Sequence, residues 1–493
     1  MRPAHSRAVF GVVTCPKCRS VRSVELAHRS AGCQRCGYRM VLTKVRIWER
    51  CDSQPELAGA IGMVAAVMLC LQLVTSGRFE FLSGRIGIDI TMAFHKWMAR
   101  LLVVLAITHP LLFLLPLDLS RPNSTWNHLV ALINRPADIP GIVALLLILG
   151  LVGLGIFRDR LPVSYEVWRA SHGLMALGAA VATLLHLLHA GIYADATVSR
   201  IYWIVLVVGA VALAIGVYTV RVRQMHRQDW TLSGKRRLAD RLWEIRLTSK
   251  ASKNLAYQAG QFAWVAFAPR RFPLFDHPFS IASAPNDAGE FRFLIQEAGD
   301  FTAAIGDLET GTPAAIDGPH GSFTLAERQS GAVVLIAGGV GLAPILSMLE
   351  DLARRGDPRP VRFVYAARDA AALVDPRIFE PWLERLDSRS FILLDRQPLG
   401  PGQRQGPLDR ELLTEALEGL EPTDIAVMIC GPAGMMSAAC GGLTSLGVPP
   451  AHIRYERFDY RGGPATAKDR AIIRNFRILA LALGVAMLAF AFR

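Results

Sequence analysis

Cysteine is scarce in this sequence, and its distribution excludes a disulfide framework. Only eight of the 493 residues are cysteine. Four of them form one cluster near the start of the chain, and the others are scattered at Cys51, Cys70, Cys430 and Cys440. Small secreted domains instead carry paired cysteines throughout. A secretory signal peptide is not expected either, because the first fifty residues contain no apolar core of the required length.

Acidic residues are outnumbered by basic ones. The chain has 41 Asp and Glu against 54 Lys and Arg, which gives a net charge of +13. In a soluble protein this excess would suggest nucleic-acid binding. Here many of the arginines flank apolar runs, so we interpret the excess as charge retained on the cytoplasmic side of a membrane and expect no nucleic-acid partner. A hydrophobic fraction of 52% is typical of a membrane protein with a soluble part.

Five long apolar runs precede the soluble part, at 57–76, 88–115, 142–157, 168–192 and 201–220. Most approach or exceed the length needed to cross ~30 Å of hydrocarbon. Arginines gather in every second connection and after the last run, at Arg78, Arg85, Arg158, Arg160, Arg221, Arg223 and Arg227. We expect these segments to be cytoplasmic, which leaves 117–139 and 193–200 outside the cell membrane.

Two of the runs carry a pair of histidines at the same spacing. His95 and His109 are fourteen residues apart, and so are His172 and His186. On a helix this spacing brings both imidazoles to nearly one face, roughly 21 Å apart along the axis. Two such helices predict ligation of two stacked b haems. A packing histidine is the alternative for each one, but ionisable groups inside a membrane are costly. His189 lies off this face and is interpreted as a residue that supports a ligand from behind or as a packing residue.

These segments resemble a known family. AFHKWMARLLVVLAITHP and SYEVWRASHGLMALGAAVATLLH look like the haem helices of the ferric reductase and NADPH oxidase superfamily of transmembrane flavocytochromes. The resemblance implies electron transfer from NADPH through FAD and two b haems across a membrane. Its haem histidines map onto His95, His109, His172 and His186.

The cysteine cluster consists of two CxxC pairs, CPKC and CQRC. Their cysteines are Cys15, Cys18, Cys33 and Cys36, with fourteen residues between the pairs. Each pair offers two thiolates from one tight turn, and two pairs complete a tetrahedral four-sulfur site. The pattern predicts a zinc-ribbon-like module over 10–45, with rubredoxin-like iron as the alternative. The module is also a candidate surface for an unidentified protein partner.

Beyond residue 229 the composition becomes soluble. Short strand-like runs separated by turns predict an antiparallel β-barrel over 226–326. The segment DHPFSIASAP fits the family's HPF(S/T)xxS flavin motif at His277, Pro278, Phe279, Ser280 and Ser283. GDFTAAIGDL follows a strand and opens a helix whose free N–H groups would face a pyrophosphate. The resemblance assigns this contact to Gly299, Asp300 and Thr302.

The next motifs predict an α/β nucleotide-binding domain over 330–460. DGPHGSF resembles the family's DGPxG turn, with Gly318 passing close to the nucleotide. GAVVLIAGGVGLAPILSMLEDL reads as a buried strand, a glycine-rich turn and a helix. Its residues Gly338, Gly339, Gly341 and Pro344 fit the GGxGxxP loop of the ferredoxin reductase superfamily. A helix N-terminus at such a loop favours phosphate.

Three further positions are assigned to the nicotinamide nucleotide and to hydride transfer. Arg368 follows a predicted strand, where it can meet a ribose 2′-phosphate, which favours NADPH over NADH. The resemblance places the cysteine of the CGP motif, at Cys430, Gly431 and Pro432, beside the hydride-bearing carbon. A small buried packing residue is the alternative for Cys430. Phe458 matches the aromatic residue that covers the flavin in this family.

The order of segments departs from the family's usual six spans with haem histidines on the third and fifth. Here the cysteine module precedes a five-span haem domain over 57–222, and a last apolar segment at 471–493 is a candidate sixth span. An interfacial or core helix is the alternative for this segment. Five spans and a cytoplasmic dehydrogenase place the cysteine module outside, whereas thiolate sites usually favour reducing compartments. Both sides stay open for the module.

The sequence therefore predicts a multi-domain membrane oxidoreductase with an α-helical haem bundle, a barrel-shaped FAD domain and an α/β nucleotide domain. Expected cofactors are FAD, two haem b groups, NADPH or NADH, and zinc. Electrons would pass to ferric iron, another metal, a quinone or dioxygen. One alternative is a membrane-tethered flavin reductase or redox sensor that acts on a cytoplasmic partner through the cysteine module. Another keeps the flavin reductase without haems.

Overall fold

The fold is known from a computed structural model. It describes residues 10–17, 21–25, 29–33, 36–45, 47–51, 53–75, 88–114, 126, 129–130, 133–190, 196–225, 227, 229–249, 256–269, 275–285, 289–325, 330–396, 400 and 402–456. Phe458, Cys18 and the apolar segment 471–493 lie outside these residues.

The N-terminal module contains two small antiparallel sheets. The first has the order β2-β1-β5, from Val21–Glu25, Phe10–Thr14 and Ile47–Cys51, and the second pairs β3 (Ser30–Gly32) with β4 (Arg39–Val41). Among the residues that the structure describes there, the buried core includes Val13, Cys15, Val24, Cys33, Met40 and Leu42. Domains of this size are usually stabilised by a metal, disulfides or oligomerisation.

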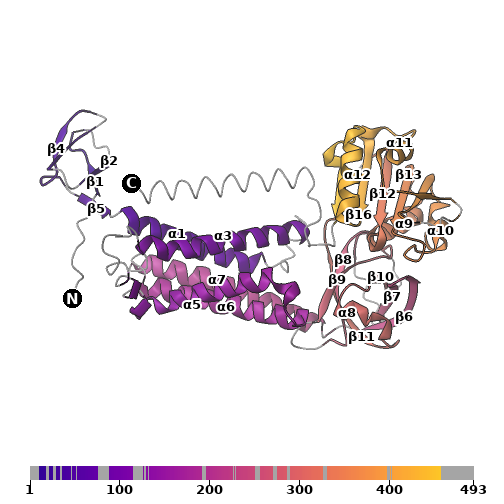
Figure 1. Ribbon diagram of the computed structural model, residues 1–493, viewed down its shortest axis with the longest axis horizontal. Coiled ribbons are helices and arrows are strands. Elements are labelled where there is room, and N and C mark those ends of the chain that lie inside the picture. The colour runs from indigo at the N-terminus through magenta and orange to yellow at the C-terminus, as the bar shows by residue number, and fades with distance from the viewer. Residues whose placement is uncertain are drawn as a thin grey trace.

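Five long helices form the middle of the molecule. They are α1 (Ser53–Val74), α3 (Ile88–Leu114), α5 (Ile139–Ile156), α6 (Tyr165–Ala190) and α7 (Thr197–Met225). The last four are long and apolar enough to cross a membrane, whereas the apolar stretch described in α1, Ala58–Val74, is shorter. Figure 1 shows the helices side by side, with the N-terminal module at one end of the bundle and the soluble domains at the other.

The helix bundle has small residues inside and large apolar residues outside. Its interior includes Ala179 and Ala210, which are buried. Leu146, Leu174 and Val205 point outward and are 62%, 63% and 64% exposed. Small residues let helices approach closely without a hydrophobic driving force between them. An outer surface of this kind is stable in lipid rather than in water, which confirms the predicted membrane domain.

The first soluble domain is an antiparallel six-stranded barrel with the strand order β10-β7-β6-β11-β8-β9. The strands are β6 (Trp230–Ala239), β7 (Leu242–Ser249), β8 (Phe262–Phe267), β9 (Asp276–Ser280), β10 (Glu290–Gln296) and β11 (Pro313–His320). A bridge between Ile281 and Phe293 brings the two edge strands together. The four-residue helix α8 (Asp300–Ala303) lies between β10 and β11.

The second soluble domain is a parallel sheet with the order β15-β14-β13-β12-β16-β17. Its strands are β15 (Gln403–Gln405), β14 (Ser388–Leu394), β13 (Val361–Ala367), β12 (Ala332–Gly338), β16 (Ile425–Cys430) and β17 (Ile453–Glu456). The helices are α9 (Leu342–Arg355), α10 (Glu380–Leu383), α11 (Arg410–Ala416) and α12 (Ala433–Ser445). The chain crosses over in opposite directions from β12, so the carboxyl ends of β12 and β16 form the crevice where such sheets bind nucleotides.

Candidate functional site

The four helix histidines form two pairs at two depths of the bundle. The ring centroids of His109 on α3 and His186 on α6 are 6.1 Å apart. His95 on α3 lies close enough to His172 on α6 to interact electrostatically with it. The structure therefore brings the histidines together in the predicted pairs. His189 points elsewhere: it is exposed, and its Nδ1 lies 2.7 Å from the carbonyl oxygen of Leu185.

The spacing of His109 and His186 fits two imidazoles that would bind one metal. Two imidazoles that each bind a metal at about 2.0–2.1 Å bring their ring centroids to roughly 6 Å. His109 Nδ1 lies 2.7 Å from the carbonyl oxygen of Ala58, to which it donates a hydrogen bond in the tautomer that leaves Nε2 free for a metal. Ligating histidines usually have such a partner behind them.

Space around the histidines is kept by glycine. A Cβ at Gly62 would lie 2.7 Å from the ring of His109, and a Cβ at Gly141 would lie 2.7 Å from His186 Nδ1. Among the described residues, the buried Nδ1 atoms of His172 and His186 have no hydrogen-bond partner. α3 packs closely on α1, and α6 on α5, while α3 and α6 approach each other at few backbone positions. The residues present fit haem between these two helices.

Three of the four N-terminal cysteines converge. Ligand atoms of Cys15, Cys33 and Cys36 all lie within 4.8 Å of one another, and the sulfurs of Cys15 and Cys36 are 3.7 Å apart. Cys15 and Cys33 are buried and Cys36 is partly so. Three thiols at this spacing fit three of the four positions of a tetrahedral thiolate site, whose fourth predicted ligand, Cys18, lies outside the described residues.

The flavin motif forms β9, at the edge of the barrel. Ser280 is buried, and its hydroxyl has no hydrogen-bond partner among the described residues. A buried hydroxyl left in this state is costly, so it marks a place where a ligand atom fits. His277 stacks on Phe301 of α8 with ring centroids 4.0 Å apart, and Phe279 lies 6.4 Å from the same ring. Pro278 is exposed between them.

Thr302 stabilises the start of the short helix α8. Its hydroxyl accepts hydrogen bonds from the backbone N–H groups of Ala298 and Gly299, at 2.8 and 2.9 Å. This is a capping box, in which the third helical residue supports the residue at the helix start. The sequence pattern indicated a helix start here and did not show that the threonine hydroxyl is already engaged.

Ser283 also has a structural role. Its hydroxyl accepts a hydrogen bond from the backbone N–H of Arg292 at 3.2 Å and lies 3.0 Å from the hydroxyl of Tyr257. Its carbonyl accepts a 2.6 Å hydrogen bond from Ser347 of α9. Burial raises the pKa of Tyr257 to about 12, so this phenol stays a neutral donor. The end of the flavin motif is therefore fixed to the nucleotide domain.

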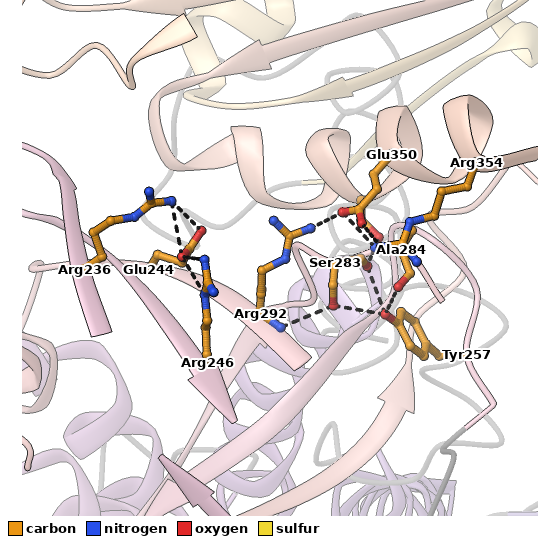
Figure 2. Close-up of polar contacts among 10 residues, drawn as sticks. Arg236, Glu244, Arg246, Tyr257, Ser283, Ala284, Arg292, Glu350 and Arg354 are labelled. Carbon is orange, nitrogen blue, oxygen red and sulfur yellow. Dashed lines mark hydrogen bonds and ion pairs between the residues drawn. The ribbon is translucent and has the colours of Figure 1, made fainter. Parts of the chain in front are cut away.

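A buried carboxylate joins the two soluble domains, and sequence reasoning missed it. Glu350 on α9 is 1% exposed. It pairs with Arg292 of β10 and with Arg354 at 2.5 Å, and it accepts a hydrogen bond from the backbone N–H of Ala284 at 3.3 Å. Figure 2 shows these groups converging between the barrel and α9. An apolar helix face gives no local signal for a buried acid within it.

The glycine loop and the CGP motif pack directly against each other. Gly341 begins α9, and a Cβ there would overlap the carbonyl of Cys430 at the end of β16. A Cβ at Gly431 would lie 3.0 Å from the Cα of Gly338. Gly339 has a φ of +54°, which disfavours side chains. Both motifs thus meet at the predicted crevice, with Pro344 buried in the first turn of α9 and Pro432 before α12.

Cys430 is fully buried, and burial raises the pKa of its thiol well above the usual range, with Glu456 acting in the same direction. Cys430 therefore presents no exposed sulfur at the end of β16.

Arg368 follows β13 and is 62% exposed, with its Nε 3.2 Å from Asp369 Oδ2. Gly318 lies within β11, where a Cβ would come 2.9 Å from that of Ala263.

Comparison with known families divides the chain in the same way. A model of the ferric reductase like transmembrane component matches residues 61–183. A model of an FAD-binding domain matches 238–322, and one of an oxidoreductase NAD-binding domain matches 335–441. The first match contains His95, His109 and His172 and ends shortly before His186.

Curated relatives match part of the chain. The reductase component of propane 2-monooxygenase from Mycolicibacterium goodii is 34% identical over 186 residues, which are 36% of this chain and 53% of that protein. The ferredoxin–NAD(P)⁺ reductase component of the naphthalene 1,2-dioxygenase system from Pseudomonas putida is 28% identical over 224 residues, or 44% and 65%. The chain thus spans about half to two thirds of the length of these relatives.

Among solved structures, the flavohaem-like FAD/NAD-binding domain of a nitric oxide dioxygenase from Vibrio cholerae is similar, with 22% identity and a TM-score of 0.41. The match covers 47% of this chain and 98% of the similar structure. The three family matches and the membrane helices decide the assignment. The chain contains a ferric reductase-like transmembrane component followed by an FAD-binding domain and an oxidoreductase NAD-binding domain.

Proposed function

We propose that this protein carries electrons from NAD(P)H through FAD and two b haems across a membrane to an acceptor on the far side. The two histidine pairs at two depths of one helix bundle are the observation that carries the proposal. Haem would supply one-electron carriers at these depths, and flavin would convert a two-electron donor into one-electron steps. Ligation by two histidines would leave no open position on the haem iron, so the acceptor would receive electrons without binding to that iron.

The residues of the membrane domain would hold the haems. His95 and His172 would bind the one nearer the soluble domains, and His109 and His186 the other. The hydrogen bond from His109 to Ala58 would orient the imidazole ring of His109. Gly62 and Gly141 would leave the room that the rings of His109 and His186 need.

The soluble domains would bind the flavin and the nucleotide. The Ser280 hydroxyl and the Phe279 ring would meet the flavin, and Gly299 and Asp300 would lie near its pyrophosphate. The glycine loop would bind the nucleotide phosphates at the start of α9, and Arg368 would meet the ribose. Cys430 and Gly431 would shape the floor under the nicotinamide. We place the dehydrogenase in the cytoplasm because of the arginines at that end of the spans.

We further propose that the domains follow the limits 10–45, 57–222, 226–326 and 330–460, with 471–493 as a candidate sixth span. Zinc on Cys15, Cys18, Cys33 and Cys36 would stabilise the first of them, whose core is small. Acceptors that fit outer-sphere transfer are ferric iron, another metal, a quinone or dioxygen. A protein partner on the cysteine module belongs to the same proposal.

Reduced-minus-oxidised spectra of the purified protein test the function. Dithionite and then anaerobic NADPH would be added to the protein as purified, with and without FAD. We expect two b haems per chain, which NADPH reduces only when FAD is present. Absence of haem in protein made with adequate haem supply would overturn the proposal. A membrane-tethered flavin reductase that serves a cytoplasmic partner would then take its place.

A further inference from the structure

The start of helix α6 lies against the flavin strand β9, although the two are more than a hundred residues apart in sequence. Arg169 Nη2 lies 2.6 Å from Asp276 Oδ1, and Arg169 Nη1 donates a 3.3 Å hydrogen bond to the backbone carbonyl of Asp276. The Asp276 side chain is 0% exposed and that of Arg169 is 16% exposed. One charge comes from the membrane domain and the other from the barrel.

A buried ion pair of this kind has strong consequences for docking. Removal of one partner leaves an uncompensated charge in a dry place, which is far more costly than the loss of an exposed pair. The adjacent motif residue repeats the arrangement, since His277 Nε2 lies 3.4 Å from Glu166 Oε1 of α6. Asp276 and His277 of the flavin strand therefore contact Arg169 and Glu166, which lie on one turn of α6.

An unbroken series of rings runs through the same contact. Trp168 stacks on His172 with centroids 5.2 Å apart, and Tyr165 stacks on Trp168 at 5.9 Å. Tyr165 then meets His277 at 5.7 Å, and His277 stacks on Phe301 at 4.0 Å. The series begins at a proposed haem ligand and ends at the flavin motif.

The two central rings are fixed from other directions. Trp168 Nε1 donates a 3.1 Å hydrogen bond to the carbonyl of Leu154 on α5. The guanidinium of Arg158 lies 4.4 Å from the Tyr165 ring and 4.9 Å from the Trp168 ring. Aromatic rings held by a cation and a hydrogen bond have little freedom to move. We call Tyr165, Trp168, Arg169, Asp276 and His277 the flavin–haem junction.

We propose that this junction is a positioning device, in which the Arg169–Asp276 pair docks the flavin strand on α6 and the Trp168 and Tyr165 rings fill the space between flavin and His172. The proposal rests on the proposed function. Oxidation of one NAD(P)H gives two electrons and one proton. The electrons cross the junction singly, the proton stays on the dehydrogenase side, and no junction side chain changes its oxidation state.

Full-length Asp276→Asn protein tests the docking pair. It removes the carboxylate that faces the buried Arg169 guanidinium, so we expect flavin-to-haem electron transfer to slow roughly tenfold or more, while NADPH reduces the flavin at the wild-type rate. Hydrogen exchange of 165–172 and 275–281 should rise in the same variant, a readout that needs no turnover. The control is Asp240→Asn, because Asp240 forms an exposed pair with Arg237 on the same barrel.

The rings are tested by a matched pair of variants. Trp168→Phe keeps a ring and should retain most of the transfer rate, whereas Trp168→Leu should lose it. Unchanged hydrogen exchange and unchanged haem reduction in Asp276→Asn would overturn the junction while leaving the proposed function intact. Equal slowing of flavin reduction would also overturn it, because the damage would then lie within the dehydrogenase. Absence of haem would instead count against the proposed function, and the exchange experiment would still judge the docking.

Discussion

At the residue scale, the carboxyl end of β13 carries two opposite charges that bear on nucleotide choice. An arginine there accommodates a ribose 2′-phosphate, whereas an acid hydrogen-bonds the 2′-hydroxyl. Arg368 and Asp369 are neighbours, with Nε and Oδ2 3.2 Å apart. The acid is occupied further by the backbone N–H of Ala372 at 3.0 Å. The arginine is therefore the more available of the two for a ligand.

Arg368→Ala should lower kcat/KM for NADPH about tenfold, the size expected for loss of one charged hydrogen bond, and leave NADH unchanged. Ferricyanide as acceptor confines the assay to the dehydrogenase. Arg377→Ala is the matched control, because Arg377 is 86% exposed and paired with Asp375. Equal losses with both nucleotides would show that Arg368 does not contact the 2′-phosphate.

His277 gives the flavin strand a dependence on pH. Burial lowers the pKa of His277, Arg169 acts in the same direction, and Glu166 and Asp276 oppose it. A buried neutral histidine takes up its proton only when exposed, so docking is fully stable above about pH 6.5 and weakens as the pH falls below it. Glu166→Gln removes one opposing carboxylate and should extend the loss to lower pH.

The measurement is hydrogen exchange of 275–281, corrected for the intrinsic pH dependence of exchange, in wild type and in His277→Phe. The phenyl ring retains the stacking on Phe301 and cannot take up a proton. We expect acidification to loosen the strand in wild type and to have little effect in the variant. The same loosening in both would assign the effect to another group.

At the scale of elements, helix α9 joins the nucleotide loop to the flavin domain. Glu350→Gln should reduce the free energy of unfolding by about 3 kcal/mol, because Arg292 would remain buried beside a neutral amide. Thermal unfolding followed by flavin fluorescence would show the loss. Glu415→Gln is the control, since Glu415 forms an exposed pair with Arg404. Similar shifts in both variants would mean that Glu350 contributes no more than a surface pair.

The elements themselves could be predicted because their signals are local. Spacing along a helix placed His95 and His109 on one face, and glycine motifs located both nucleotide turns. Contacts between elements could not be predicted in this way. Arg169 appeared only as one basic residue at the edge of an apolar run, and nothing in its neighbourhood indicates Asp276 as its partner. Ser283 fitted a flavin motif, yet its hydroxyl packs against Tyr257.

At the scale of the whole molecule, α1 determines which side the cysteine module faces. Near its start, the carbonyl of Ala58 contacts His109, which belongs to the histidine pair farther from the soluble domains. Near its end, the Gln72 side chain donates a 3.1 Å hydrogen bond to the carbonyl of His95, which belongs to the nearer pair. Helix α1 therefore traverses the same depth as α3 in the opposite direction. The soluble domains lie at the His95 end, and the cysteine module lies at the other (Figure 1).

Limited proteolysis of sealed vesicles checks this arrangement. In right-side-out vesicles we expect protease to remove the cysteine module and to leave the dehydrogenase intact, because the two lie on opposite faces. Inside-out vesicles should give the reverse result. Cleavage of both parts from one face would contradict a crossing by five helices and would show that α1 does not span the membrane.

The separation of the two histidine levels has an electrical consequence. An electron that leaves NAD(P)H on one face and reaches an acceptor on the other carries one elementary charge through the membrane voltage, worth about 2.3 kcal/mol per 100 mV. Hydride oxidation leaves its proton behind on the donor face. Under the proposed function, turnover in sealed vesicles would therefore separate charge and build a membrane potential that slows further electron transfer. An ionophore that collapses this potential would restore the rate.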